Sequence, residues 1–182
     1  MEKPKRDPVV PEMRARLMAN RDGRIMKGQW FDLIVEPLLI LVVLLGLSFI
    51  LFGDDMIALF DDAGWLILPI IALVIFLPAL LRAYHYARAP VHFIRLYAGV
   101  QPWWGFWKPM VFYTKKDELV RFPRRLAPRM LVKINGEYLI YYLDEPGGKV
   151  LLSLAPVDHE DAEFWMPTKS FAVRRERRTG HG

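Results

Sequence analysis

Two long apolar runs occupy the first half of the chain. The run over residues 33–52 contains a single charged residue, Glu36, in its first turn, and the run over residues 63–81 contains none. A helix of about twenty residues crosses the roughly 30 Å hydrocarbon core of a bilayer. Because the rest of the chain is too short to surround two helices that are apolar on every face, we interpret the runs as two transmembrane spans.

The connection between the spans, residues 53–62, contains four aspartates and neither lysine nor arginine. Basic residues are frequent before the first span and directly after the second. By the positive-inside rule, we expect a two-span protein of the cell membrane, with both termini in the cytoplasm and the acidic loop on the other side. The loop lacks the alternating oxygen ligands and the glycine of a calcium-binding loop, so a turn is favoured over a metal site.

Charged residues also occur at the expected cytoplasmic boundary of this hairpin. Asp32 and Glu36 are four residues apart and therefore share one helix face, and Arg82 follows the second span directly. We expect an interfacial charge cluster there. The alternative is an entry point for a proton or a cation, since ionisable groups at membrane depth are often functional.

After residue 83 the pattern changes to short runs in which apolar and polar residues alternate. Six of these runs are rich in β-branched and aromatic residues and are predicted to be strands. They are Val91–Ala98, Pro109–Tyr113, Glu118–Phe122, Arg129–Ile134, Glu137–Leu143 and Lys149–Leu154.

Turn residues connect the last three runs into a meander. Asn135-Gly136 is typical of a type I′ turn, in which both residues have positive φ, and residues 145–148 predict a looser turn. Asp158 is expected to cap a short acidic helix that ends before Pro167. The fold class that follows is an α+β membrane protein: a transmembrane helical hairpin followed by a small antiparallel β-rich domain with a short C-terminal helix.

The chain is therefore expected to have four parts: a basic N-terminal segment (1–29), the hairpin (30–83), a cytoplasmic β-rich domain (84–173) and a basic tail (174–182). This arrangement resembles, in architecture, small bacterial membrane proteins that carry a pleckstrin-homology-like domain behind a helical hairpin. The resemblance implies the fold alone. No motif of that group matches this sequence residue by residue, so no site is carried over.

An aromatic cluster follows the second span by some twenty residues. It consists of Trp103, Trp104, Phe106 and Trp107 in the stretch QPWWGFWKP. Indole is amphipathic, so we expect these side chains to contact lipid headgroups or a membrane protein partner, and we expect Trp30 to be an interfacial anchor. Ordinary core packing and stacking on a ligand are the alternatives. Nucleic acid is not an expected partner, because topology already explains the positive charge.

The basic residues outside the spans give the chain a formal net charge of +5. The segment before the hairpin is expected either to form a helix after Pro11 that lies on an anionic leaflet, or to be a solvated arm. The arginine-rich C-terminal segment is expected to be a disordered tail attracted to anionic lipid. Contacts with anionic headgroups are therefore predicted for Arg14, Arg16, Arg21, Arg24, Lys27, Arg174, Arg175, Arg177 and Arg178.

The sequence offers little catalytic chemistry. It contains no cysteine, which excludes disulfides, thiolate metal sites and cysteine nucleophiles. His159 and Glu163 are four residues apart but lack a third ligand, and the chain contains no glycine-rich phosphate loop or nucleophile elbow. We therefore predict no catalytic residue, no metal and no cofactor.

By elimination, the sequence predicts a non-enzymatic accessory subunit or assembly scaffold of a larger membrane complex. Its expected partners are the lipid bilayer, anionic headgroups and other membrane protein subunits. One alternative is a lipid-recognition module at the membrane surface. Another is a small membrane-surface enzyme, which would require Asp117 and Glu118 to converge with His92 in a pocket.

Overall fold

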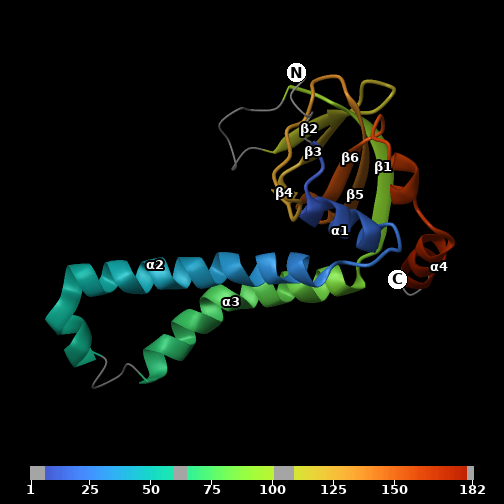
Figure 1. Cartoon of the computed structure of the whole chain (residues 1–182). Coiled ribbons are helices and arrows are strands. Elements are labelled where there is room, and N and C mark those ends of the chain that lie inside the picture. The colour runs from blue at the N-terminus through green and yellow to red at the C-terminus, as the bar shows by residue number, and fades with distance from the viewer. Residues whose placement is uncertain (1–6, 60–64, 101–108, 180–182) are drawn as a thin grey trace. The chain divides into compact units, whose positions relative to one another are not determined.

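A computed structural model describes residues 7–59, 65–100 and 109–179 of the chain (Figure 1). The chain divides into two compact units. Residues 30–87 form the helical hairpin, and residues 1–29 together with 88–182 form what we call the sheet domain. The sequence instead separated segment 1–29 from the β-rich domain as a part of its own.

The hairpin consists of two long helices, α2 (Lys27–Leu59) and α3 (Trp65–Arg88). Within them, Lys27–Leu47 and Pro69–Arg88 are each long and apolar enough to cross a membrane. Helix α2 extends into the predicted acidic loop. Helix α2 continues through Leu59, so the first pair of aspartates is helical and does not belong to a turn. At 33 residues, α2 is about 50 Å long.

Apolar side chains are exposed around most of the circumference of α2. Between Leu38 and Leu47 the exposed positions follow one another along the helix, and only Leu41 and Leu45, one turn apart, are half-buried. On α3, Val74 is 66% exposed. A helix that is apolar on every side requires an apolar surrounding, which is a bilayer or other helices.

The sheet domain contains a curled, mixed sheet of six strands in the order β3-β2-β1-β5-β6-β4. The sequence predicted a wholly antiparallel arrangement, but β4 pairs with β6 in parallel. The predicted strand 129–134 is absent, and β1 occupies the edge of β5 that the predicted meander assigned to it. The strands are β1 (Val91–Ala98), β2 (Met110–Tyr113), β3 (Leu119–Phe122), β4 (Arg124–Arg125), β5 (Glu137–Glu145) and β6 (Gly148–Pro156).

The two predicted turns differ in outcome. Asn135 has a φ of 60°, but Gly136 does not have the positive φ of a type I′ turn. The turn closes with the Gly136 amide donating to the Lys133 carbonyl at 3.1 Å, and it leads a loop, not a strand, into β5. The turn between β5 and β6 is confirmed. Gly148 has a φ of 129° there, and a Cβ atom at Gly148 would lie 2.8 Å from Cγ of Pro123, so the position requires glycine.

The concave face of the curled sheet holds an aromatic core. Phe112 packs against Phe122 with ring centroids 5.6 Å apart and against Tyr138 at 6.2 Å. Phe122 also meets the ring of Tyr142 at 5.9 Å. Because the sheet curls, β3 approaches β6 across this core, and the aromatic side chains fill the space between them.

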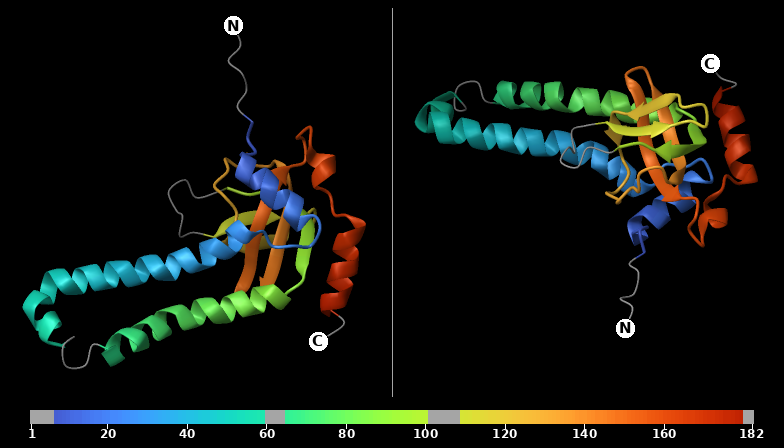
Figure 2. Two further views of the ribbon diagram at one scale, coloured as in Figure 1. Left: turned by 60° about the horizontal axis from the view of Figure 1, so that its bottom comes forward. Right: turned by 90° about the horizontal axis from the view of Figure 1, so that it is seen from above.

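Helix α1 (Pro11–Asn20) lies across β6 on the opposite face of the sheet (Figure 2). Its Met13 and Leu17 are both 0% exposed. The helix predicted after Pro11 is confirmed, and the alternative of a solvated arm is wrong, because one side of the helix packs on the sheet. Its contact with an anionic leaflet stays a prediction. Its apolar positions complete the core of a domain whose strands begin some seventy residues later.

A buried polar network joins α1, the start of α2 and β6. The Ser153 hydroxyl donates to Oδ1 of Asn20 at 2.7 Å, and Nδ2 of Asn20 donates to the Arg24 carbonyl at 2.7 Å. Nε2 of Gln29 donates to the Leu152 carbonyl at 2.8 Å. The side chains of Asn20, Gln29 and Ser153 are fully buried, so these bonds fix the N-terminal segment to the sheet.

Two short helices follow β6. The predicted acidic helix is only a 3-10 turn, η2 (Ala162–Trp165), and Asp158 does not cap it. The predicted disordered tail is an ordered helix, α4 (Lys169–Thr179), whose Phe171 is buried. The ring of Phe171 meets that of Tyr141 on β5, with centroids 6.0 Å apart. The apolar Phe171 therefore anchors a segment that composition alone suggested would be solvated.

Candidate functional site

The chain passes between the sheet domain and the hairpin at two points, and both lie at one end of the sheet. Helix α3 ends at Arg88 and β1 begins at Val91. Gln29, in the first turn of α2, is bonded to Leu152 of β6. Leu152 is level with the β5 residues that pair with the start of β1. We call this end of the sheet the hairpin end.

Helix α4 connects these two crossing points. At its C-terminal end, Nη1 of Arg178 donates to the carbonyl of Ala89 at 2.7 Å, directly after α3. Just before its first residue, the Thr168 hydroxyl donates to Oδ1 of Asp22 at 2.8 Å, in the linker that leads into α2. The Thr168 amide also donates to the Arg21 carbonyl at 3.1 Å. Both contacts hold α4 against residues that immediately flank the hairpin.

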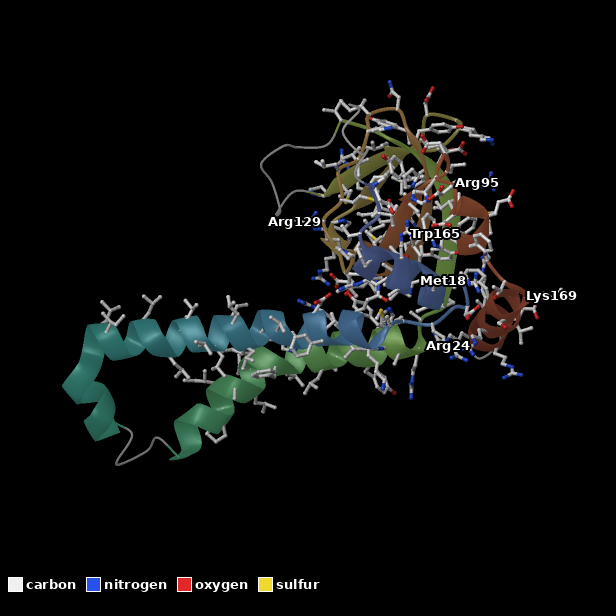
Figure 3. The ribbon with its side chains drawn as sticks, viewed as in Figure 1. Met18, Arg24, Arg95, Arg129, Trp165 and Lys169 are labelled. Carbon is white, nitrogen blue, oxygen red and sulfur yellow. The ribbon has the colours of Figure 1, made fainter. Side chains whose placement is uncertain are left out.

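The segments around the crossing points are strongly basic. We define the basic collar as linker residues 21–27, Arg88 and α4, which together contain nine basic and two acidic residues. Arg24, Lys27, Lys169, Arg175 and Arg177 are exposed, and none of the five forms an ion pair with another residue of the described chain. Figure 3 labels Arg24 on the linker and Lys169 on α4, and basic side chains surround that helix.

Two arginines of the predicted set of lipid contacts have acidic partners within the sheet domain. Arg16 is only 3% exposed and bonds to Glu12 one turn earlier in α1. Arg14 bridges Asp7 and Asp161, with Nη1 at 3.0 Å from Oδ2 of Asp161. Both side chains are used inside the sheet domain. Arg21 is half-buried and donates to the Phe164 carbonyl, so its contribution to the collar is mainly its charge.

A second cluster of ionisable groups lies on the concave face at the hairpin end. His92 stacks on Tyr142 with centroids 5.2 Å apart, and its Nε2 is 3.5 Å from Oδ2 of Asp144. Lys149 bonds to Asp144 at 2.6 Å and lies 4.7 Å above the Tyr142 ring. Burial lowers the pKa of His92. The negative charge of Asp144 raises this pKa, whereas the positive charges of Arg175 and Lys149 lower it further. His92 is therefore neutral at physiological pH, and its contact with Asp144 is not an ion pair.

The lowered pKa of His92 predicts a pH dependence of folding. In the unfolded chain His92 takes up a proton near its usual pKa of 6.5, whereas the folded domain resists protonation. The unfolded state then binds more protons, so the free energy of unfolding should fall as the pH drops from about 7 to about 5. In that window, urea unfolding of the His92→Gln variant should depend less on pH than that of the parent. Equal slopes for both proteins would contradict this assignment.

His159 lies in a third cluster, between the N-terminal segment and η2. Its Nδ1 accepts the Asp161 amide at 3.0 Å, which leaves the proton on Nε2, 3.1 Å from Oδ1 of Asp7. The Val9 amide, His159 and Arg14 together lower the pKa of Asp7 to about 2. Both ring nitrogens of His159 are thus occupied, so the ring acts as a structural link and is not available as a metal ligand or a general base.

A cavity of about 490 Å³ opens beside His159, at the end of the sheet opposite the hairpin end. Its walls combine the carboxylates of Asp7, Asp158 and Glu160 with Lys133 and the apolar surfaces of Leu131 and Tyr138. This lining favours a positively charged group over an anion. Among the residues that the structure describes, no three histidine, aspartate or glutamate side chains come together as a metal site.

The convergence required for the membrane-surface enzyme does not occur. His92 pairs with Tyr142 near the start of β1. Asp117 and Glu118 belong to the β2–β3 turn, which follows Tyr113, and Tyr113 pairs with Tyr97 near the other end of β1. Nearly the full length of β1 therefore separates the histidine from the two carboxylates, and they do not form one pocket.

The structure leaves the aromatic cluster undescribed, because Trp103, Trp104, Phe106 and Trp107 lie outside the described residues. The residues that flank this stretch are nevertheless placed. Gly99 follows the last residue of β1 and donates to the Val111 carbonyl at 3.1 Å. The stretch is therefore attached at the end of β1 that is remote from α3, although only some twenty residues separate it from the helix in sequence.

The remaining predicted residues lie on the hairpin helices. Trp30 and Asp32 are in the first turns of α2, where Trp30 is half-buried and Asp32 is exposed. Arg82 is half-buried in α3. Glu36 is one turn beyond Asp32 on α2, and its side chain is outside what the structure describes. The proposed charge cluster therefore stays a prediction.

No family model, curated protein or solved structure gives a significant match to this chain. The functional argument therefore rests on the residues and contacts described above.

Proposed function

We propose that this chain is a two-span integral membrane protein that serves as a non-enzymatic accessory subunit or assembly scaffold of a larger membrane complex. The observation that carries this proposal is the exposed apolar circumference of α2 and α3. Leu38 and Ile40, on nearly opposite faces of α2, are 47% and 45% exposed. Two helices bury little of each other, so much of this surface is available to lipid and to the helices of partner subunits.

The orientation that we propose places both chain termini and the sheet domain in the cytoplasm. Its support is the distribution of positive charge. The basic collar adjoins the ends of α2 and α3 that connect to the sheet domain, whereas residues 53–62 contain no lysine or arginine. Lysine and arginine near the ends of spans favour the cytoplasmic side.

Site-specific photo-crosslinking in native membranes tests the accessory-subunit role. Leu39 and Val43 share one face of α2, and Ile40 and Leu44 share the neighbouring face. A photoreactive residue is placed at each of the four positions in turn. One of the two pairs should give a protein adduct of one defined mass at both of its positions, and the other pair should label lipid. Subunit packing predicts this dependence on face, because only one side of α2 would meet the partner.

Two outcomes would contradict the proposal at different levels. If all four positions give lipid adducts alone, the proposed partner subunit is contradicted, and the hairpin is a simple membrane anchor. If alkaline carbonate extracts the full-length chain from membranes, the proposed membrane insertion itself is contradicted. A photoreactive residue at Lys115, which is exposed on the sheet domain, is the control for labelling that does not depend on the spans.

A further inference from the structure

The basic collar joins segments that are far apart in the sequence. Residues 21–27 and α4 are separated by more than one hundred and forty positions, as the bond between Thr168 and Asp22 illustrates. They are also closely packed, because a Cβ atom at Gly23 would lie 3.5 Å from Cβ of Arg174. The sequence presents two unrelated basic segments, whereas the fold makes them one continuous surface.

The basic collar includes or contacts the residues through which the chain enters α2 and leaves α3. Lys27 is the first residue of α2. Ala89, which accepts the bond from Arg178, follows the last residue of α3. If α2 and α3 cross a bilayer, both points are at the same membrane surface, and α4 is held beside that surface by contacts at both of its ends. This step rests on the proposed membrane insertion.

We infer that the basic collar binds the phosphate groups of anionic phospholipids. Charge complementarity supports this occupant, because the collar contains nine basic and only two acidic residues, and six of the basic residues are exposed. Arginine and lysine near a membrane surface attract anionic headgroups, and arginine offers several donors to one phosphate. The collar is also anchored through Phe171, so the positive charges are ordered before lipid arrives.

The inferred role is specific to one surface of the sheet domain. Other exposed basic residues, Lys115, Lys116 and Arg121, lie on β3 and the turn before it, whose residues pair with β2 and not with the strands at the crossing points. They carry the same charge but are not connected to either span. They therefore provide a matched control for a general effect of positive charge.

The test uses the full-length protein in proteoliposomes of phosphatidylcholine that contain a minor fraction of phosphatidylglycerol. The measurement is the association of spin-labelled phosphatidylglycerol relative to spin-labelled phosphatidylcholine. The parent protein should prefer the anionic lipid, and the triple variant Lys169→Gln, Arg175→Gln, Arg177→Gln should lose about tenfold or more of that preference. High salt should weaken the preference of the parent. The control variant Lys115→Gln, Lys116→Gln, Arg121→Gln should match the parent.

The outcomes separate this inference from the proposed function. If the triple variant stays in the bilayer and keeps the parent's preference for anionic lipid, the inferred lipid binding by the collar is overturned, but the proposed membrane insertion is not. Soluble glycerophosphate that abolishes the preference at low concentration would identify a site for a free phosphate and also overturn the inference. If alkaline carbonate extracts the parent protein from membranes, both the proposed function and this inference are contradicted. Unchanged hydrogen exchange at Phe171 in the variant shows that α4 remains folded.

Discussion

Replacing Leu17 by alanine should lower the free energy of unfolding of the sheet domain by about 2–5 kcal/mol. Leu17 is 0% exposed on α1, and its removal leaves a cavity against β6 that the surrounding side chains only partly fill. If α1 lay on a membrane or in solvent, the same substitution would cost almost nothing. The size of the effect therefore reports directly on whether segment 1–29 belongs to the fold.

The neighbouring methionine provides the matched control. Met18 is 43% exposed on the same helix (Figure 3), so Met18→Ala should change the free energy of unfolding by no more than about 1 kcal/mol. Pulse proteolysis of the full-length protein in detergent at increasing urea concentrations measures both variants. Similar midpoints for Leu17→Ala and the parent protein would contradict the packing of α1 on the sheet.

Replacing Asn20 by leucine should destabilise the sheet domain by about 2–4 kcal/mol. The substitution keeps a similar volume but removes the acceptor of the Ser153 hydroxyl and the donor to the Arg24 carbonyl, both at 2.7 Å. The Ser153 hydroxyl is then buried without this partner, since Ser153 is 0% exposed. An unpaired buried polar group loses its hydration without any compensation.

A double-mutant cycle with Ser153→Ala distinguishes the lost bond from altered shape. If the cost of Asn20→Leu arises from the orphaned hydroxyl, then adding Ser153→Ala should recover about 1 kcal/mol or more of it. Additive costs for the two substitutions, measured by the same urea titration, would show that the network is not coupled and that leucine simply fits poorly.

The helices of the hairpin and most strands could be predicted because their signals are local. Long apolar runs indicate α2 and α3 whatever surrounds them, and alternating apolar residues indicate β1, β5 and β6. The strand 129–134 was a wrong prediction with an instructive cause. Its composition suits a strand, but β1 pairs along the edge of β5 where the meander required it. Arg124 and Arg125, which have no strand pattern, pair with β6 instead. Tertiary pairing outweighed local propensity there.

The sequence located the basic residues but not which of them lie together on the folded surface. Composition alone identified the basic residues at both termini, but it could not show that Arg16 is buried beside Glu12 while Arg24 is exposed. A signal for α1 was present in the sequence, because Met13 and Leu17 are four residues apart and share a helix face. A helix was therefore one of the expectations, but the surrounding arginines suggested an anionic membrane as the surface that it contacts, since a basic amphipathic segment is typical of a membrane-surface helix.

What the sequence determined by itself is the presence of two long apolar helices, the strands that follow them, and the basic charge on either side. These features depend on residues that are near one another along the chain. The tertiary structure alone decided that the two ends of the chain belong to one domain, through Leu17 on β6, Ser153 on Asn20 and Thr168 on Asp22. Such contacts join residues more than one hundred positions apart. The pattern of apolar residues in a short segment does not predict them, because burial of the segment depends on the surface that it packs against.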